Sequence, residues 1–127
     1  MKFKMVENGV QTDVDYGQLS ISSDETKGFR PFQLMIASIV GCSSMVLTKI
    51  LDKQRIEVTE LTVEAEAQRN PKEANRIEQL SINFFIKGPN LEQTKLEKTL
   101  KIARKNCAMV RSVEDSIDIQ DTIEVLE

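Results

Sequence analysis

The chain has 127 residues, a size that fits a single domain spanning residues 1–127. Its 17 basic and 20 acidic side chains give a net charge of −3, which argues against a nucleic-acid partner. Histidine is absent, which excludes His-based nucleophilic triads, His-ligated zinc and imidazole proton transfer. Catalysis would therefore have to use other groups, among them the two cysteines, Cys42 and Cys107.

The first thirty residues predict three short strands joined by turns. Residues 1–5 alternate between apolar and lysine side chains, and Asn8-Gly9 is a strong hairpin signal. Residues 10–16 predict the second strand, and residues 19–21 begin the third. The N-terminus carries charges but no apolar run, so we expect a cytoplasmic protein with reduced thiols.

An uncharged run, residues 31–48, predicts a long helix that starts at Pro31 and continues to about residue 53. Its length is at the lower edge of what spans a bilayer, roughly 17–25 residues. Polar residues such as Gln33 interrupt the run, and the neighbouring segments alternate like the strands of a soluble protein. These features favour a buried central helix and no membrane contact.

The remainder predicts a hairpin, a second helix and a final strand. The hairpin is formed by residues 56–67 and 80–86, and a change of phase near Thr59-Glu60 predicts a bulge. Residues 91–106 have one apolar stripe, which is typical of a helix, and residues 117–125 predict a strand. The expected order is β-β-β-α-β-β-α-β, an α+β domain with an antiparallel sheet and two helices.

Both cysteines fall on helix faces that should point inward. A free cysteine commonly packs as a small hydrophobic residue, so a structural role remains open for each thiol. For Cys42 to react, a nearby cation should lower the pKa of its thiol, because a position in mid-helix gains little from the helix N-terminus. Several arginines are candidates, and the sequence does not choose among them: Arg30, Arg76, Arg104 and Arg111.

Two segments resemble the OsmC/Ohr family. Residues 31–43, PFQLMIASIVGCS, are similar to its central-helix motif, in which a Pro-x-x-Leu start leads through small residues to a reactive cysteine. Residues 106–112, NCAMVRS, resemble the cysteine element after the family's second helix, with Ala108 in place of the usual proline. The order of strands and helices matches as well, so the resemblance covers nearly the whole chain.

The resemblance implies an OsmC-like fold in an intertwined homodimer, and a thiol-dependent peroxidase that reduces small organic hydroperoxides. Cys42 would be the peroxidatic thiolate that becomes a sulfenic acid, and Cys107 the resolving thiol that joins it in a disulfide. A dithiol reductant of the lipoyl type would restore both thiols, and neither a cofactor nor a metal is implied. Apolar walls would favour organic peroxides: Phe32, Met35, Ile39 and Met45.

The helix start differs from that of the family's peroxidases, which carry a glutamate there to orient a catalytic arginine. This chain has Phe32 and the uncharged Gln33, so Arg76, Arg30 and Gln33 are its candidates for supporting the thiol. The same lack of a carboxylate disfavours a hot-dog thioesterase. A second interpretation stays open, a non-catalytic dimeric OsmC-like protein that binds a lipophilic ligand in an apolar interface pocket.

Overall fold

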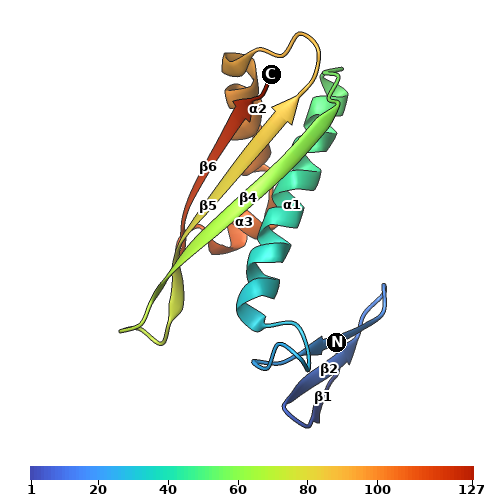
Figure 1. Ribbon diagram of the computed structural model, residues 1–127, viewed down its shortest axis with the longest axis vertical. Coiled ribbons are helices and arrows are strands. Elements are labelled where there is room, and N and C mark those ends of the chain that lie inside the picture. The colour runs from blue at the N-terminus through green and yellow to red at the C-terminus, as the bar shows by residue number, and fades with distance from the viewer. The chain divides into compact units, whose positions relative to one another are not determined.

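The computed structural model describes residues 1–127, which form two compact units, Met1–Ala37 and Ser38–Glu127. Figure 1 shows the secondary structure of both units. The helices and strands in chain order are β1 (Phe3–Val6), β2 (Gly9–Asp13), β3 (Gln18–Ile21), α1 (Pro31–Lys53), β4 (Glu60–Asn70), β5 (Arg76–Lys87), α2 (Gln93–Lys105), α3 (Ala108–Val113) and β6 (Asp118–Val125).

The first unit contains an antiparallel three-stranded sheet in the order β1-β2-β3. Its first hairpin turns at Asn8, which has a positive φ of 64°, as the sequence predicts. Gly9 is required there because a Cβ at this position would collide with the carbonyl oxygen of Ile21. The Ser22 hydroxyl donates a hydrogen bond to the Asn8 carbonyl and ties the end of β3 to this turn.

Helix α1 begins at Pro31 and ends at Lys53, in agreement with the sequence prediction. By length and composition it could cross a membrane, with a mean hydropathy of 1.9, a test that core helices of soluble proteins also pass. In the single chain α1 is buried over only part of its surface, less than the expected buried central helix. Its fully buried residues are Ile39, Leu47 and Leu51, because the chain's own elements cover only part of its surface.

The second unit contains a three-stranded sheet in the order β4-β5-β6. Strands β4 and β5 are antiparallel, as expected, but β6 runs parallel to β5, which corrects the prediction of an all-antiparallel sheet. The reason is the crossover through α2 and α3, which returns the chain to the end of the sheet where β5 began. The bulge lies at Gln68/Arg69 rather than at Thr59-Glu60, because residues 56–58 precede the strand.

The predicted second helix, residues 91–106, corresponds to α2, and a third helix that the sequence did not predict follows it. Helix α2 ends at Lys105, and α3 begins at Ala108 after an extended residue, Cys107. Asn106 ends α2 by donating a side-chain hydrogen bond of 2.8 Å to the Ile102 carbonyl, a local competition with the helix that asparagine favours. The chain therefore has three helices instead of two, and Cys107 lies at a junction.

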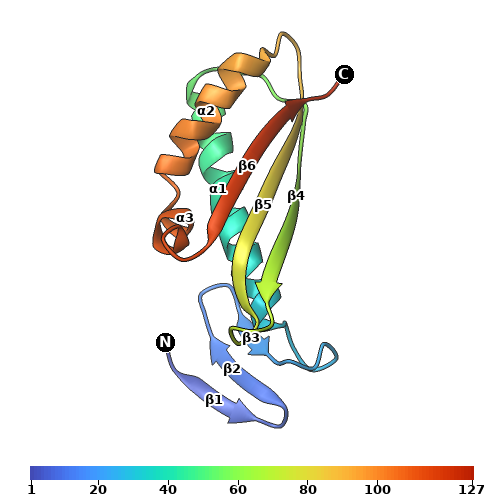
Figure 2. The same cartoon turned by 90° about the vertical axis from the view of Figure 1, so that its left-hand side faces the viewer.

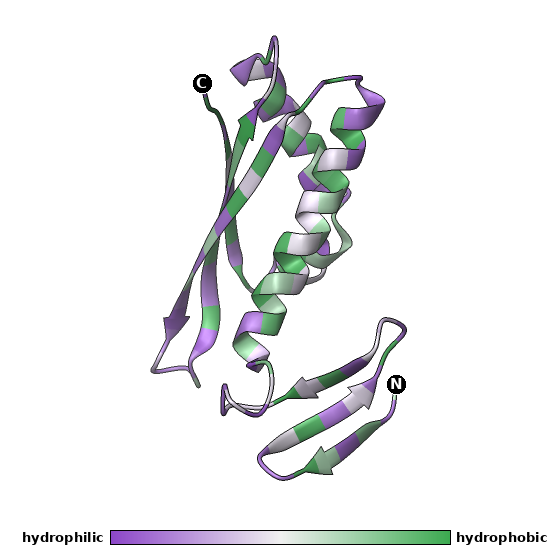
Figure 3. Ribbon diagram, turned by 45° about the vertical axis from the view of Figure 1, so that its right-hand side comes forward, coloured by the Kyte–Doolittle hydropathy of each residue, from purple (hydrophilic) through white to green (hydrophobic).

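The core of the second unit lies between the helices and one face of the sheet (Figure 2). Alternate residues of β5 are fully buried, among them Leu80 and Phe84, and Leu96 and Leu100 of α2 are buried as well. The intervening residues of β5 are only half-buried, so the period-two pattern places one face of the strand in the core. Figure 3, coloured by hydropathy, shows apolar residues along much of the length of α1.

Candidate functional site

The first thiol lies in the middle of α1. Cys42 is a free cysteine and is half-buried. Its neighbours along the helix are small, and a Cβ added at Gly41 would meet no atom within 4 Å. The next turn carries Met45, whose side chain is 68% exposed. This part of α1 is therefore partly open to solvent.

The second thiol lies at the junction of α2 and α3. Cys107 is free and has no exposed surface. Its backbone N–H donates to the Arg104 carbonyl at 3.3 Å, and its own carbonyl accepts the Arg111 N–H at 3.0 Å. The sulfur lies 3.4 Å from the hydroxyl oxygen of Ser43, which follows Cys42 in α1. The fold thus brings the Cys107 sulfur to the turn of α1 that carries the first thiol.

Hydrogen bonds from this junction lower the pKa of the Cys42 thiol. The largest cause is the backbone N–H of Met109, followed by the side chain of Cys107, and the N–H of Ala108 makes a smaller contribution. Burial opposes them by disfavouring the charged thiolate. Because Ala108 and Met109 are the first residues of α3, their N–H groups have no partner within that helix and are available to the sulfur.

Three of the candidate arginines lie in the second unit and are engaged with other groups. Arg76 donates to the carbonyl of Ser116 and to its hydroxyl, the latter at 3.0 Å. Arg104 lies 3.6 Å from the Asp121 carboxylate and donates to the Ile119 carbonyl at 2.7 Å. Arg111 pairs with a glutamate, Glu114, at 3.0 Å. None of these three guanidinium groups is among the causes that lower the pKa of Cys42.

The other two supporting candidates belong to the first unit. Arg30 immediately precedes α1, and its carbonyl accepts the Leu34 N–H at 3.0 Å, the first hydrogen bond of the helix. Gln33 is exposed in the first turn of α1. The structure thus brings Cys42 and Cys107 together within the second unit, whereas the roles of Arg30, Gln33 and Arg76 stay predictions.

Sequence reasoning missed two features of the thiol site. Ser43 was one small residue among several, and its sequence context does not single out its contact with Cys107. The N–H groups of Ala108 and Met109 carry no side-chain signature at all. The replacement of the family's proline by Ala108 was the one available sign, because proline has no N–H to donate.

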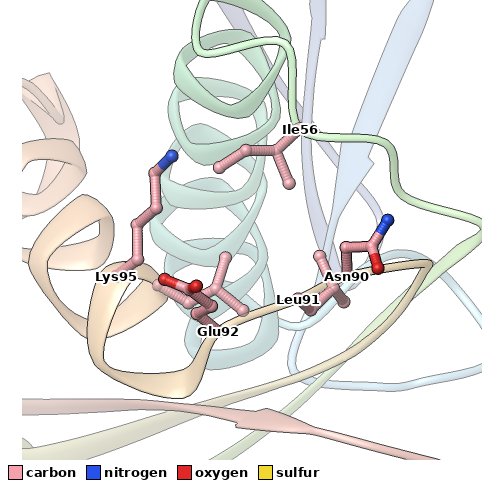
Figure 4. A pocket seen from close by; sticks show the side chains of 6 residues that line it. Ile56, Asn90, Leu91, Glu92 and Lys95 are labelled. Atoms are coloured by element: carbon pink, nitrogen blue, oxygen red, sulfur yellow. The ribbon is translucent and has the colours of Figure 1, made fainter.

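A separate groove of about 140 Å³ lies where the chain leaves α1 and where α2 begins (Figure 4). The groove lies at the start of α2, and Cys107 follows the other end of that helix, which is roughly 20 Å long. The groove is therefore not part of the thiol site. No group of three or more Cys, Asp and Glu side chains in the chain is placed to hold a metal ion. The groove is lined by Ile56, Asn90, Leu91, Glu92, Lys95 and Leu96.

Comparison with known proteins places the chain in a family. Residues 23–121 match the family described as OsmC-like protein, so the chain belongs to the OsmC-like family. Protein YhfA of Escherichia coli is 22% identical over 97 residues, which are 76% of this chain and 72% of that protein.

Solved structures share the fold over nearly the whole chain. A hypothetical protein from Aquifex aeolicus has a TM-score of 0.87 at 23% identity, covering 98% of this chain and 93% of its own. An organic hydroperoxide resistance protein OsmC from Legionella pneumophila has a TM-score of 0.75 at 16% identity, with coverage of 98% and 94%. These likenesses confirm the predicted α+β, OsmC-like fold.

Proposed function

We propose that the chain is a thiol-dependent peroxidase that reduces organic hydroperoxides. The observation that carries the proposal is the position of the Cys107 sulfur, 3.4 Å from the hydroxyl of Ser43, the residue that follows Cys42, together with hydrogen bonds that lower the pKa of the half-buried Cys42. A thiolate, rather than a thiol, is the nucleophile in peroxide chemistry. A second thiol beside the same turn of α1 is what a disulfide-forming mechanism requires.

The reaction divides between the two cysteines. The Cys42 thiolate attacks the distal oxygen of the hydroperoxide, the O–O bond breaks, and the alkoxide leaves as an alcohol after taking a proton. Cys42 is then a sulfenic acid. The Cys107 sulfur attacks the Cys42 sulfur, the S–O bond breaks, and water leaves as the disulfide forms. A dithiol of the lipoyl type reduces that disulfide and is itself oxidised to a cyclic disulfide.

Organic hydroperoxides are the proposed substrates because the surroundings of Cys42 are apolar. Met45 lies one turn further along α1, and Met109 follows the second thiol. Both side chains are substantially exposed, so they are available to contact an alkyl or aryl group. The likeness to a protein named for organic hydroperoxide resistance supports the same class of substrate.

We propose a homodimer as the working form, without nucleic acid or membrane. Both units expose apolar side chains: Phe3, Met5 and Tyr16 in the first, and Met45 in the second. Apolar exposure of this extent commonly marks a protein interface. Sedimentation at increasing concentration should show the dimer, and Met45→Glu should shift it toward monomer by burying a charge in the interface.

Thiol loss on titration with peroxide tests the activity. The reduced protein should lose two thiols per equivalent of cumene hydroperoxide, and should react more slowly with hydrogen peroxide. The Cys42→Ser variant is the matched control, since Cys107 remains. The proposal fails if Cys42→Ser consumes the organic peroxide as fast as the parent protein.

A non-catalytic binding protein is the second candidate. The observation that favours it is the engagement of Arg76, Arg104 and Arg111 with Ser116, Asp121 and Glu114, which leaves none of them among the groups that act on Cys42. This candidate predicts a lipophilic ligand retained in the native dimer by mass spectrometry. It also predicts peroxide consumption no faster than that of free cysteine.

A further inference from the structure

Ser43 makes a contact that sets it apart from several other helical hydroxyl groups of the chain. Serine and threonine in a helix commonly bond to a backbone carbonyl three or four residues earlier. Ser44 donates to Val40 at 2.7 Å, and Ser112 donates to Ala108 at 2.7 Å. The Ser43 hydroxyl instead lies 3.4 Å from the sulfur of Cys107, a residue distant in the sequence.

The surroundings of Cys107 make this contact informative. The side chain of Cys107 has no exposed surface, so solvent water does not solvate its sulfur in this arrangement. A sulfur anion in such a place needs donors from the protein, because burying an unpaired charge is costly. A hydroxyl can serve as one, and a thiolate can only accept.

We propose that Ser43 is the positioning residue for Cys107. Its hydroxyl holds the Cys107 sulfur beside the turn of α1 that carries Cys42, and donates a hydrogen bond to that sulfur when the proton is lost. The role in peroxide reduction rests on the proposed function, but the hydrogen bond itself belongs to the reduced protein whatever its activity.

The loss of the Ser43 hydroxyl should affect the second chemical step, in which the disulfide forms. There the Cys107 sulfur gives up its proton, forms the S–S bond with Cys42, and displaces the sulfenic oxygen, which leaves as water. Ser43 acts on the attacking sulfur and not on the peroxide. Its loss should therefore slow disulfide formation, lengthen the life of the sulfenic acid, and increase further oxidation of Cys42 to sulfinic acid.

Single-turnover kinetics with cumene hydroperoxide test this role. Ser43→Ala should form the sulfenic acid at the parent rate, within about twofold, and close the disulfide about tenfold more slowly, as expected for a lost hydrogen bond to a charged group. Ser44→Ala is the matched control, since that hydroxyl is bonded within its own helix. Ser43→Thr should restore the rate. Equal closure rates in Ser43→Ala and Ser44→Ala would overturn the proposal.

A redox equilibrium tests the same hydrogen bond without peroxide. The Cys42–Cys107 disulfide is equilibrated with dithiothreitol, and the variants are compared. Because the bond stabilises only the reduced state, Ser43→Ala should make the disulfide about tenfold harder to reduce, or about 30 mV more negative in potential. If no variant consumes peroxide, the proposed function fails while this equilibrium still decides on Ser43. An unchanged potential would count against the hydrogen bond.

Discussion

Cys42 lies in a turn of α1 that stays half-open to solvent, whereas Cys107 is fully covered where α2 meets α3. The α1 turn is flanked by small residues and is followed by an exposed methionine, Met45. The α2–α3 junction is held by backbone hydrogen bonds on both sides of Cys107. One region therefore admits a reagent, and the other presents hydrogen-bond donors from a fixed backbone.

The difference shows how the two regions depend on each other. The α1 turn supplies the nucleophile, but the groups that lower its pKa come from the junction. The junction supplies the second sulfur, but the hydroxyl beside that sulfur, from Ser43, comes from the α1 turn. Each region therefore supplies a group that acts on the thiol of the other. A substitution in one region should be assayed by its effect on the reactivity of the thiol in the other region.

The largest expected effect separates the two cysteines. Cys42→Ser should abolish reaction with organic hydroperoxide, because the accessible thiolate is gone. Cys107→Ser should still consume one equivalent but stop at the sulfenic acid. Dimedone labelling followed by mass spectrometry distinguishes the two products. Dimedone adducts on Cys107 in the Cys42→Ser protein, formed at the parent rate, would show that the assigned roles are reversed.

The pH dependence should expose the contribution of Cys107 to Cys42. A lowered pKa means that the thiolate is present below the pH at which an ordinary cysteine ionises. Alkylation of Cys42 should therefore rise with pH and level off earlier than for free cysteine. In Cys107→Ala the plateau should move to higher pH, because the side-chain hydrogen-bond donor is lost, whereas Cys107→Ser keeps a hydroxyl donor and serves as the control. Peptide mass spectrometry measures the rate at Cys42 alone.

A smaller effect is expected at the first position of α3. Ala108→Pro removes one N–H donor from the Cys42 sulfur, and proline suits the first turn of a helix, so the fold should be kept. The pKa of Cys42 should rise, and its alkylation rate at pH 7 should fall about two- to threefold. Ala108→Gly keeps the N–H and serves as the control. A rate as low in the glycine variant as in the proline variant would indicate a change of backbone instead.

The smallest effect concerns the arginine. Arg76→Gln should change the peroxide rate less than twofold, because the guanidinium is bound at Ser116. Arg76→Lys is the control that keeps the charge. Stopped-flow rates with cumene hydroperoxide measure both. A loss of tenfold or more in the glutamine variant alone would restore the sequence hypothesis that Arg76 supports the thiol.

Local signals in the sequence predicted most elements because neighbouring residues determine them. Pro31 and the apolar run after it predicted both ends of α1, and Asn8 predicted the first hairpin. The direction of β6 was not predictable in this way, since the alternation of a strand is the same in parallel and antiparallel sheets. Helix α3 was not predicted either, because its six residues are too few to show a helical pattern and Val110 is the one buried residue among them.

The amino-acid sequence was enough to identify the family, the long helix, and the two thiols as the groups on which chemistry could depend. Those properties are carried by residue types and their spacing. Folding brings the Cys107 sulfur to the turn of α1 that carries Cys42, and it places backbone N–H groups, rather than the guanidinium groups of Arg76, Arg104 and Arg111, where they lower the pKa of Cys42. Every non-proline residue has an N–H, so its use as a donor depends on folding and leaves no mark in the sequence.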